Sequence, residues 1–210
     1  MLGVNVGDAV KRSLDSWKRK DWDMAMLYAT TAVAGTAAKG DATSGIGTRF
    51  RAVVRDYLDV VQVMATPGID LSKSRFPVAV RSDLPDKRPD IADVAYGIHR
   101  RGHGHDDELP NGFEVTPYVA GSSVLRIAND GKVQVTSGLV LGLLGCAVIS
   151  PENKGEKIPP GYQLTWYQHT FFIENWWGWR DHFREMISIV QSAQTELDYG
   201  ATWRKWTPLD

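Results

Sequence analysis

The sequence is almost free of cysteine, because Cys146 is the only one among 210 residues. One chain therefore cannot close an internal disulfide, which favours a reducing compartment. Cys146 lies inside the apolar run 139–149, and this position predicts a buried thiol rather than a nucleophile. The start of the chain also lacks the basic and apolar stretches of a secretory signal. We therefore expect a cytoplasmic protein.

Long hydrophobic runs and a strong net charge are absent too. The apolar run covers only about a dozen residues, whereas a membrane-spanning helix needs about 20, so it predicts a core helix and no membrane association. The net charge of −1 gives no overall attraction to nucleic acid, so any such role must rest on a local cluster. With 43% hydrophobic and 23% charged residues and no visible repeat, we expect one domain over residues 1–210.

What the sequence does contain is helical periodicity, which predicts a mainly α fold, a helical bundle. Helices are expected over about 8–19, over 22–38 after an Asp21 cap, and over 47–65, with a fourth beginning after an Asp90 cap. A core helix is expected over about 137–150. Several charged residues of the third helix are expected to face solvent: Arg49, Arg51, Arg55, Asp56 and Asp59.

Residues 113–136 have a different, β-like pattern. Strands are expected within 113–119, 122–128 and 132–136, and the turn signal Asn129-Asp130-Gly131 predicts a β-hairpin there. A short strand is expected within 163–172. A closing helix is expected from near Asn175, with apolar residues at helical spacing as far as Leu197.

One polar cluster stands out at the end of the fourth helix. It holds three histidines, two arginines and three carboxylates within ten positions: His99, Arg100, Arg101, Gly102, His103, Gly104, His105, Asp106, Asp107 and Glu108. Histidine exchanges protons near neutral pH, and arginine holds a phosphate or a developing negative charge. Together they can support metal-free cleavage of a phosphodiester.

Two other interpretations of the cluster stay open. The side chains of His99, His103, His105 and Asp106 are also suitable first ligands of a divalent metal. Alternatively, the cluster is a solvated helix end followed by a turn, with its histidines satisfied locally. Gly102 and Gly104 each cost about 1 kcal/mol relative to Ala inside a helix, so the helix is expected to fray, bend or end here.

Helical geometry separates two residues of special interest. At 100° per residue, Arg100 and His105 lie about 140° apart on a straight helix and do not share a face. The pairs that do share a face are four residues apart: His99 with His103, and Arg101 with His105. Joint action of Arg100 and His105 therefore requires a break at the glycines or a second subunit.

The segment Arg100 to His105 resembles the Arg-x4-His signature of the HEPN superfamily of small helical ribonuclease and nucleotide-binding domains. The wider stretch 96–110 is similar to a pattern in bacterial HEPN-like proteins, as are Asp21 to Tyr28, residues 32–37 and Arg49 to Leu58. The resemblance covers about residues 5–150. It implies a helical bundle that dimerises and brings the two motifs to a shared cleft.

The resemblance also implies roles for individual residues. Arg100 corresponds to the arginine that stabilises phosphate charge, and His105 to the histidine of proton transfer. Arg101, His99 and His103 are the substrate-binding candidates, and no metal or other cofactor is expected. Two features depart from the family's pattern: Arg101 stands where active members often have a small polar residue, and His103 and Gly104 replace an apolar pair.

Three functions follow as hypotheses. The first is a metal-independent endoribonuclease, or an RNA- or nucleotide-binding protein, in stress response or phage defence. The second is a non-catalytic dimeric interaction domain, in which the cluster holds a helix end or a dimer contact together. The third is a metal-dependent hydrolase that uses the histidines and Asp106.

Overall fold

The computed structural model describes residues 5–40, 43–102, 112–117, 125–128, 130–166, 169–189 and 194–209. The α-helices are α1 (Val6–Lys18), α2 (Trp22–Lys39), α3 (Ile46–Asp56), α4 (Leu58–Ala65), α5 (Ile91–Gly102), α6 (Gly138–Ile149) and α7 (Arg180–Ser188). The strands are β1 (Phe113–Thr116), β2 (Leu125–Ile127), β3 (Val133–Thr136), β4 (Gln163–Trp166) and β5 (His169–Phe172). Short 3-10 turns are η1 (Pro151–Asn153), η2 (Ile173–Asn175) and η3 (Gly200–Lys205).

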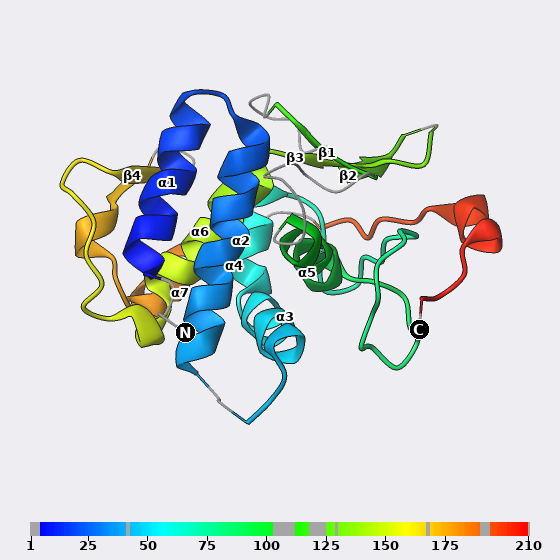
Figure 1. The fold of residues 1–210 in the computed structure, drawn as a ribbon, viewed down its shortest axis with the longest axis horizontal. Helices are drawn as coiled ribbons and strands as arrows, with labels where there is room; N and C mark the ends of the chain where they lie inside the picture. Colours follow the sequence, from blue (N-terminus) through cyan, green and yellow to red (C-terminus); the bar gives the residue numbers. More distant parts are fainter. Residues whose placement is uncertain are drawn as a thin grey trace.

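The fold is mainly α, as the periodicity predicts, and α2 and α6 lie at its centre. Helix α2 contacts α1, α3, α5 and α6, and α6 also packs on α4 (Figure 1). Nearly every side chain of α6 is buried, as expected for a helix that is apolar on all sides. Glycine makes the α4–α6 contact close, because a Cβ on Gly142 would lie 3.1 Å from the Cα of Val61.

The predicted caps are confirmed. The Asp21 carboxylate accepts a hydrogen bond from the Met24 backbone N–H at 3.3 Å, and Asp90 accepts one from Asp93 N–H at 2.9 Å. The single helix predicted over 47–65 is wrong in one respect, because Tyr57 divides it into α3 and α4. Tyr57 leaves helical geometry with φ −110° and ψ 23°, and its ring is buried.

The predicted hairpin near residues 113–136 is confirmed and belongs to a small sheet. Strands β2 and β3 pair in antiparallel register, with Leu125 opposite Val135, and β1 adds to β3 in parallel. Gly131 has a φ of 85°, which is the left-handed region that a tight hairpin turn requires.

Two predictions for the last third of the chain need correction. Residues 163–166 and 169–172 form the antiparallel pair β4–β5, where one strand was expected. The closing helix α7 begins at Arg180, not near Asn175, because Gly178 has a φ of 80° and packs on Lys154, where a Cβ would meet the lysine's Cβ at 2.9 Å. It ends at Ser188, so Leu197 is not part of it.

Residues 194–209 form a C-terminal arm that lies along the loop 66–90 (Figure 1). Ile69 and Thr195 form a parallel β-bridge, and Leu197 N–H donates to the Ser74 hydroxyl at 3.0 Å. Trp206 Nε1 donates to the Val78 carbonyl at 2.9 Å. These bonds tie the arm to the loop that leads into α5.

The structure bears on two features that are scarce in the sequence, cysteine and long apolar segments. Cys146 is completely buried within α6, and its thiol donates to the Gly142 carbonyl at 3.2 Å. Burial raises the pKa of this thiol, which makes it a poor nucleophile. Within the described part of the chain, no helix has both the length and the apolar character that crossing a membrane requires.

Candidate functional site

The polar cluster begins on the last turns of α5, and the first turn of this helix is unusually well anchored. Asp90 and Asp93 cap each other's backbone: Asp93 N–H donates to Asp90 Oδ1 at 2.9 Å, and Asp90 N–H donates to Asp93 Oδ2 at 3.3 Å. Reciprocal bonds of this kind satisfy N–H groups that have no partner within a helix. The start of α5 is thereby fixed in direction.

Two arginines of α3 hold these carboxylates from the side. Arg55 Nε donates to Asp90 Oδ2 at 2.7 Å, and Arg51 Nε lies 2.6 Å from Asp93 Oδ1. Arg55 also pairs with Asp83 of the preceding loop at 2.7 Å. Asp93 is 0% exposed and Arg51 only 7%. Charges of opposite sign, of which Arg51, Asp90 and Asp93 are buried, therefore join α3, α5 and the loop before α5. We call this set of ion pairs the α3–α5 anchor.

Burial and ion pairing shift the pKa values of Asp93 and Arg55 in opposite directions. Burial, together with the neighbouring Asp90 carboxylate, raises the pKa of Asp93, whereas Ser82 and Arg55 counteract this effect. For Arg55, burial favours the neutral form, but the hydrogen bonds to Asp90 and Asp83 prevail and raise its pKa. Arg55 therefore stays charged around neutral pH.

Aromatic stacking continues the anchor along α5 toward the cluster. The Arg51 guanidinium lies 4.4 Å from the centre of the Tyr96 ring. The His99 ring stacks on Phe50 with 5.3 Å between centroids and 19° between planes. A Cβ on Gly47 would lie 2.7 Å from the Tyr96 ring, so this glycine leaves room for the stack. The His99 ring of α5 thus packs on α3.

The structure describes only part of the cluster that the sequence singles out. His99 is half-buried in the stack, and the Arg100 side chain is exposed on α5. Arg101 belongs to α5, but its side chain lies outside the described residues, as do His103 and His105. The convergence of Arg100 with His105, and the metal set that includes Asp106, therefore remain predictions. Among the described residues, no group of three or more His, Cys, Asp or Glu side chains is placed to hold a metal ion.

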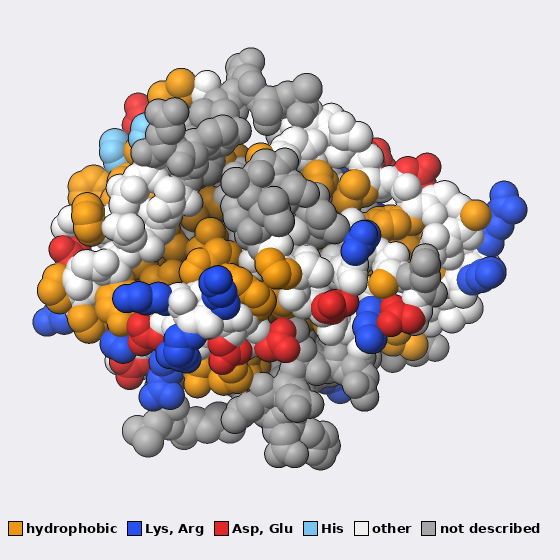
Figure 2. Space-filling view, turned by 90° about the horizontal axis from the view of Figure 1, so that it is seen from above, with side chains coloured by type: hydrophobic (Ala, Val, Ile, Leu, Met, Phe, Trp, Pro, Cys, Tyr) orange, Lys and Arg blue, Asp and Glu red, His pale blue; other side chains and the backbone are white. Residues whose placement is uncertain are grey.

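A basic surface adjoins α5, and sequence reasoning missed it. We define it by six exposed cations, namely Arg81, Lys87, Arg88, Arg100, Arg204 and Lys205. Figure 1 shows that the loop 66–90 and η3 lie on the same side of α5, and Figure 2 shows Lys and Arg side chains on the projecting right-hand end, although more of them gather at the opposite end beside Asp and Glu.

Specific contacts bring these segments together. The Arg88 guanidinium lies 4.8 Å from the Trp203 ring centre of η3. Val80 packs against Gly97, where a Cβ would lie 2.6 Å from Val80 Cγ1, and Arg100 is one helical turn further along α5. Two acidic residues of the loop are paired with arginines, since Asp83 lies 2.7 Å from Arg55 and Asp86 lies 3.8 Å from Arg75. Two further acidic residues, Glu196 and Asp198, are exposed on the arm before η3.

The expectation that every charged residue of the third helix faces solvent is wrong for Arg51, which is buried. Arg49 is half-buried, as is Arg55. The sequence contained a sign that Arg51 and Arg55 act together. They are four residues apart and share a helix face, with the apolar residues Phe50 and Val54 nearby. The partner carboxylates are at least 28 residues away in the sequence, so spacing alone did not identify them.

Comparisons with known proteins place the whole chain in a family. The family model Rv1289 matches residues 5–203, nearly the whole chain. The chain belongs to the Rv1289 family. The similar proteins include Rv1289 of Mycobacterium tuberculosis and Mb1320 of Mycobacterium bovis. Each is 60% identical over 207 residues, which is 98% of this chain and 99% of the relative.

The names of these Rv1289-family relatives state no activity. No solved structure matches the chain significantly. The family model covers the α3–α5 anchor and the C-terminal arm as far as residue 203.

Proposed function

We propose that this Rv1289-family protein binds single-stranded RNA at the basic surface and cleaves it without a metal ion. The observation that supports the proposal is the set of six exposed cations on the loop 78–88, on η3 and at the end of α5. RNA binding is driven largely by Lys and Arg that neutralise phosphates, and the exposed part of Trp203 offers a face for base stacking.

The proposed reaction uses the residues that the HEPN resemblance assigns. The ribose 2′-oxygen attacks the adjacent phosphorus, His105 accepts the 2′-hydroxyl proton, and the bond from phosphorus to the 5′-oxygen breaks. A solvent water molecule gives a proton to that oxygen, which leaves a 2′,3′-cyclic phosphate and a 5′-hydroxyl. Arg100 stabilises the negative charge that develops on the phosphoryl oxygens.

The anchor beneath α5 suits this role. Catalytic groups must be held within a fraction of an ångström of the productive geometry, and the buried ion pairs of Arg51 and Arg55 restrain the helix that carries Arg100. The dimer that the HEPN resemblance implies is part of the same proposal, because a second chain supplies a His105 free of the 140° constraint. Analytical ultracentrifugation measures whether the protein is a dimer.

The test is cleavage of a mixed set of single-stranded RNAs in the presence of EDTA. We expect products with 2′,3′-cyclic phosphate ends, and a loss of about 100-fold or more in rate for Arg100→Ala and for His105→Ala, since acid–base and electrostatic groups each contribute about that much. Lys18→Ala, which removes an exposed cation from α1, is the matched control and should cleave normally.

Two results would contradict this proposal. Activity that EDTA abolishes would indicate a metal-dependent hydrolase. Intact RNA in every reaction, together with a change of oligomeric mass in the His105→Ala variant, would instead indicate a non-catalytic interaction domain.

A further inference from the structure

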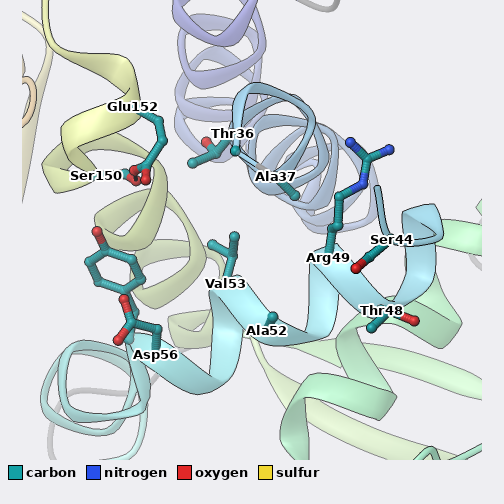
Figure 3. Close-up of a pocket in the computed structure, with 12 residues that line it drawn as sticks. Thr36, Ala37, Ser44, Thr48, Arg49, Ala52, Val53, Asp56, Ser150 and Glu152 are labelled. Atoms are coloured by element: carbon teal, nitrogen blue, oxygen red, sulfur yellow. Dashed lines mark hydrogen bonds between the residues drawn. The ribbon is translucent and has the colours of Figure 1, made fainter. Parts of the chain in front are cut away.

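Two hollows of the surface differ in whether their polar groups have partners. The smaller one, of about 280 Å³, lies between α2, α3 and the segment after α6 (Figure 3). At its polar end Ser150 and Arg180 both hydrogen-bond to the buried Tyr57 hydroxyl, so these groups are already satisfied. The larger hollow, of about 580 Å³, lies between α1 and β4. We call it the α1–β4 groove.

One wall of the α1–β4 groove is strand β4, which is an edge strand. It pairs with β5 on one side, and no other described strand pairs with it on the opposite side. The Ile173 N–H donates to the Tyr162 carbonyl at 2.9 Å, and hydrogen-bonded and non-hydrogen-bonded pairs alternate along an antiparallel ladder. By this alternation, Gln163 and Thr165 stand at the non-hydrogen-bonded positions of β4.

The backbone groups at these two positions point away from β5. Gln163 and Thr165 both line the groove, and their N–H and C=O groups make no hydrogen bond within the described part of the chain. A strand edge with unpaired N–H and C=O groups is a template for a further strand, and extended peptides are commonly recognised by addition to such an edge. The groove therefore offers backbone hydrogen bonds at two positions, two residues apart.

The floor of the groove is apolar. Leu164 is 4% exposed, whereas the side chains on either side of it in β4 are exposed, as alternation along a strand requires. In an added strand, the residue opposite Leu164 projects to the same face of the sheet as Leu164, so an apolar residue fits there. Three partly buried apolar side chains line the groove beside it: Leu14, Trp17 and Leu141.

The charges in the groove favour an acidic partner. Among the described residues that line it, Asp15 is the one carboxylate and Lys18 the one cation. The charge of Asp15 is balanced, because Lys11 Nζ lies 2.7 Å from its Oδ2 and the Tyr162 hydroxyl donates to its Oδ1 at 2.7 Å. Lys18 is exposed, and no described carboxylate lies within ion-pair distance of it. The groove therefore keeps one uncompensated positive charge.

We propose that the α1–β4 groove binds an extended, acidic peptide segment of a partner protein, which adds to β4 as a third strand of the β4–β5 sheet. The peptide backbone pairs with Gln163 and Thr165, and an apolar residue opposite Leu164 fills the floor of the groove. Acidic residues on either side of this apolar residue pair with Lys18. A segment as long as β4 itself, which has four residues, is enough.

This site is separate from the proposed RNA surface. The groove lies on the α1 side of α2, whereas α5 and the basic surface lie on the other side of α2 (Figure 1). Either outcome of the peptide experiment therefore leaves the ribonuclease proposal unchanged, and Lys18 stays outside the surface that binds RNA.

The experiment titrates the full-length protein with short peptides and follows binding by NMR. The first probe is Thr-Glu-Leu-Glu-Thr with an acetylated N-terminus and an amidated C-terminus, which places an apolar residue between two acidic ones. We expect it to bind at least about fivefold more tightly than Thr-Lys-Leu-Lys-Thr, because the exchange converts an attraction to Lys18 into a repulsion.

N-methylated peptides test the backbone pairing. Methylation of both glutamate N–H groups removes the donors that face β4 and should abolish binding. Methylation of the leucine N–H removes a donor that points away from β4, so this peptide should bind nearly as well as the first probe.

Variants of the protein locate the site. Thr165→Pro removes the N–H that faces the groove but no bond between β4 and β5, and it should weaken binding of the acidic peptide at least about tenfold. Thr170→Pro makes the same change at the outer edge of β5, outside the groove, and should leave the Kd unchanged. Lys18→Glu should reverse the preference between the acidic and basic peptides, whereas Lys132→Glu on the β2–β3 hairpin should not.

Four results would overturn the proposal. They are equal affinity for the acidic and basic peptides, full binding of the peptide with both glutamates methylated, equal losses in Thr165→Pro and Thr170→Pro, and no binding of any peptide. If Thr165→Pro does not fold, the methylated peptides test the same backbone hydrogen bonds on the native protein.

Discussion

Single charged side chains in this protein act very differently according to their burial. Arg51 and Asp93 are buried together between α3 and α5, whereas Arg180 and Asp181 form an exposed contact at 3.4 Å. Removing one partner from a buried ion pair leaves an uncompensated charge, which is far more costly than losing an exposed pair. The same substitution type therefore has different consequences at the two positions.

We expect Asp93→Asn to lower the free energy of unfolding by about 3–5 kcal/mol. The shape of the side chain is kept, but Arg51 loses its buried counter-charge and Arg55 loses one contact. Urea unfolding measures the change. Asp181→Asn is the matched control and should cost less than about 1 kcal/mol. Equal stability of the two variants would show that the α3–α5 anchor contributes little.

The pH dependence of stability has a specific expected contributor, Asp70, in the loop 66–90 along which the C-terminal arm lies. Asp70 Oδ1 accepts bonds from Ser72 Oγ at 2.6 Å and Ser72 N at 3.1 Å, and Asp70 Oδ2 lies 3.0 Å from Lys73 Nζ. Hydrogen bonds from Ser72 and Lys73 lower the pKa of Asp70 to about 2.

Because the folded pKa lies below the unfolded value of about 3.9, the stabilisation by Asp70 is complete above about pH 4 to 5. It is lost as the pH falls toward 2. We therefore expect the stability difference between the native protein and Asp70→Asn to be largest near pH 6 and to shrink as the pH falls from 5 to 2. Chemical unfolding at a series of pH values measures it, and a difference independent of pH would contradict the assignment.

At the scale of helices and strands, close packing decides where glycine is required. Gly7 of α1 donates its N–H to Glu156 Oε2 at 3.0 Å, and a Cβ there would lie 2.1 Å from the Lys157 carbonyl oxygen. The clashing atom belongs to the backbone, so the loop 154–162 must move to make room for a methyl group.

Gly7→Ala should therefore destabilise the protein by about 1–3 kcal/mol, despite the higher helix propensity of alanine. Gly45→Ala serves as the control, since a Cβ on Gly45 would meet no atom within 4 Å. Gly45 is the N-cap of α3, where alanine is less favourable than glycine, so we expect the control to cost only about 0.5 kcal/mol. A thermal unfolding series distinguishes the two, and a Gly7→Ala protein as stable as the control would show that the loop yields freely.

The sequence correctly predicted the ends of helices and strands that neighbouring residues determine, through a capping side chain or a turn glycine. The caps Asp21 and Asp90 and the Gly131 turn are of this kind, and all three are confirmed. The break at Tyr57 and the late start of α7 have distant causes instead: burial of the Tyr57 ring, and the contact of Gly178 with Lys154, 24 residues earlier. A window of neighbouring residues does not contain that information.

The candidate site residues also differ in whether neighbouring residues in the sequence reveal them. The exposed Arg100 follows from the cluster that the sequence displays. The basic surface does not, because it joins the loop 78–88 to η3, more than 100 residues later in the chain.

At the scale of the whole molecule, the C-terminal arm brings η3 next to the loop 66–90, and both carry cations of the basic surface. The hydrogen bond from Trp206 to Val78 and the stacking of Arg88 on Trp203 hold η3 against the loop that leads into α5. The positive charge is thus local, whereas the net charge of the chain is only −1. Binding of RNA through such a surface must weaken steeply as salt rises.

The most direct test of the account measures the salt dependence of binding to a single-stranded RNA that carries 2′-O-methyl groups and resists cleavage. For single strands, each phosphate contact contributes about 0.7 to the slope of log affinity against log salt. We predict that Arg100→Ala lowers the slope by about 0.7 and that the double variant Arg204→Ala, Lys205→Ala lowers it by about 1.4, whereas Lys18→Ala leaves it unchanged. Absence of salt-dependent binding, or equal slopes for all four proteins, would contradict the proposed RNA surface.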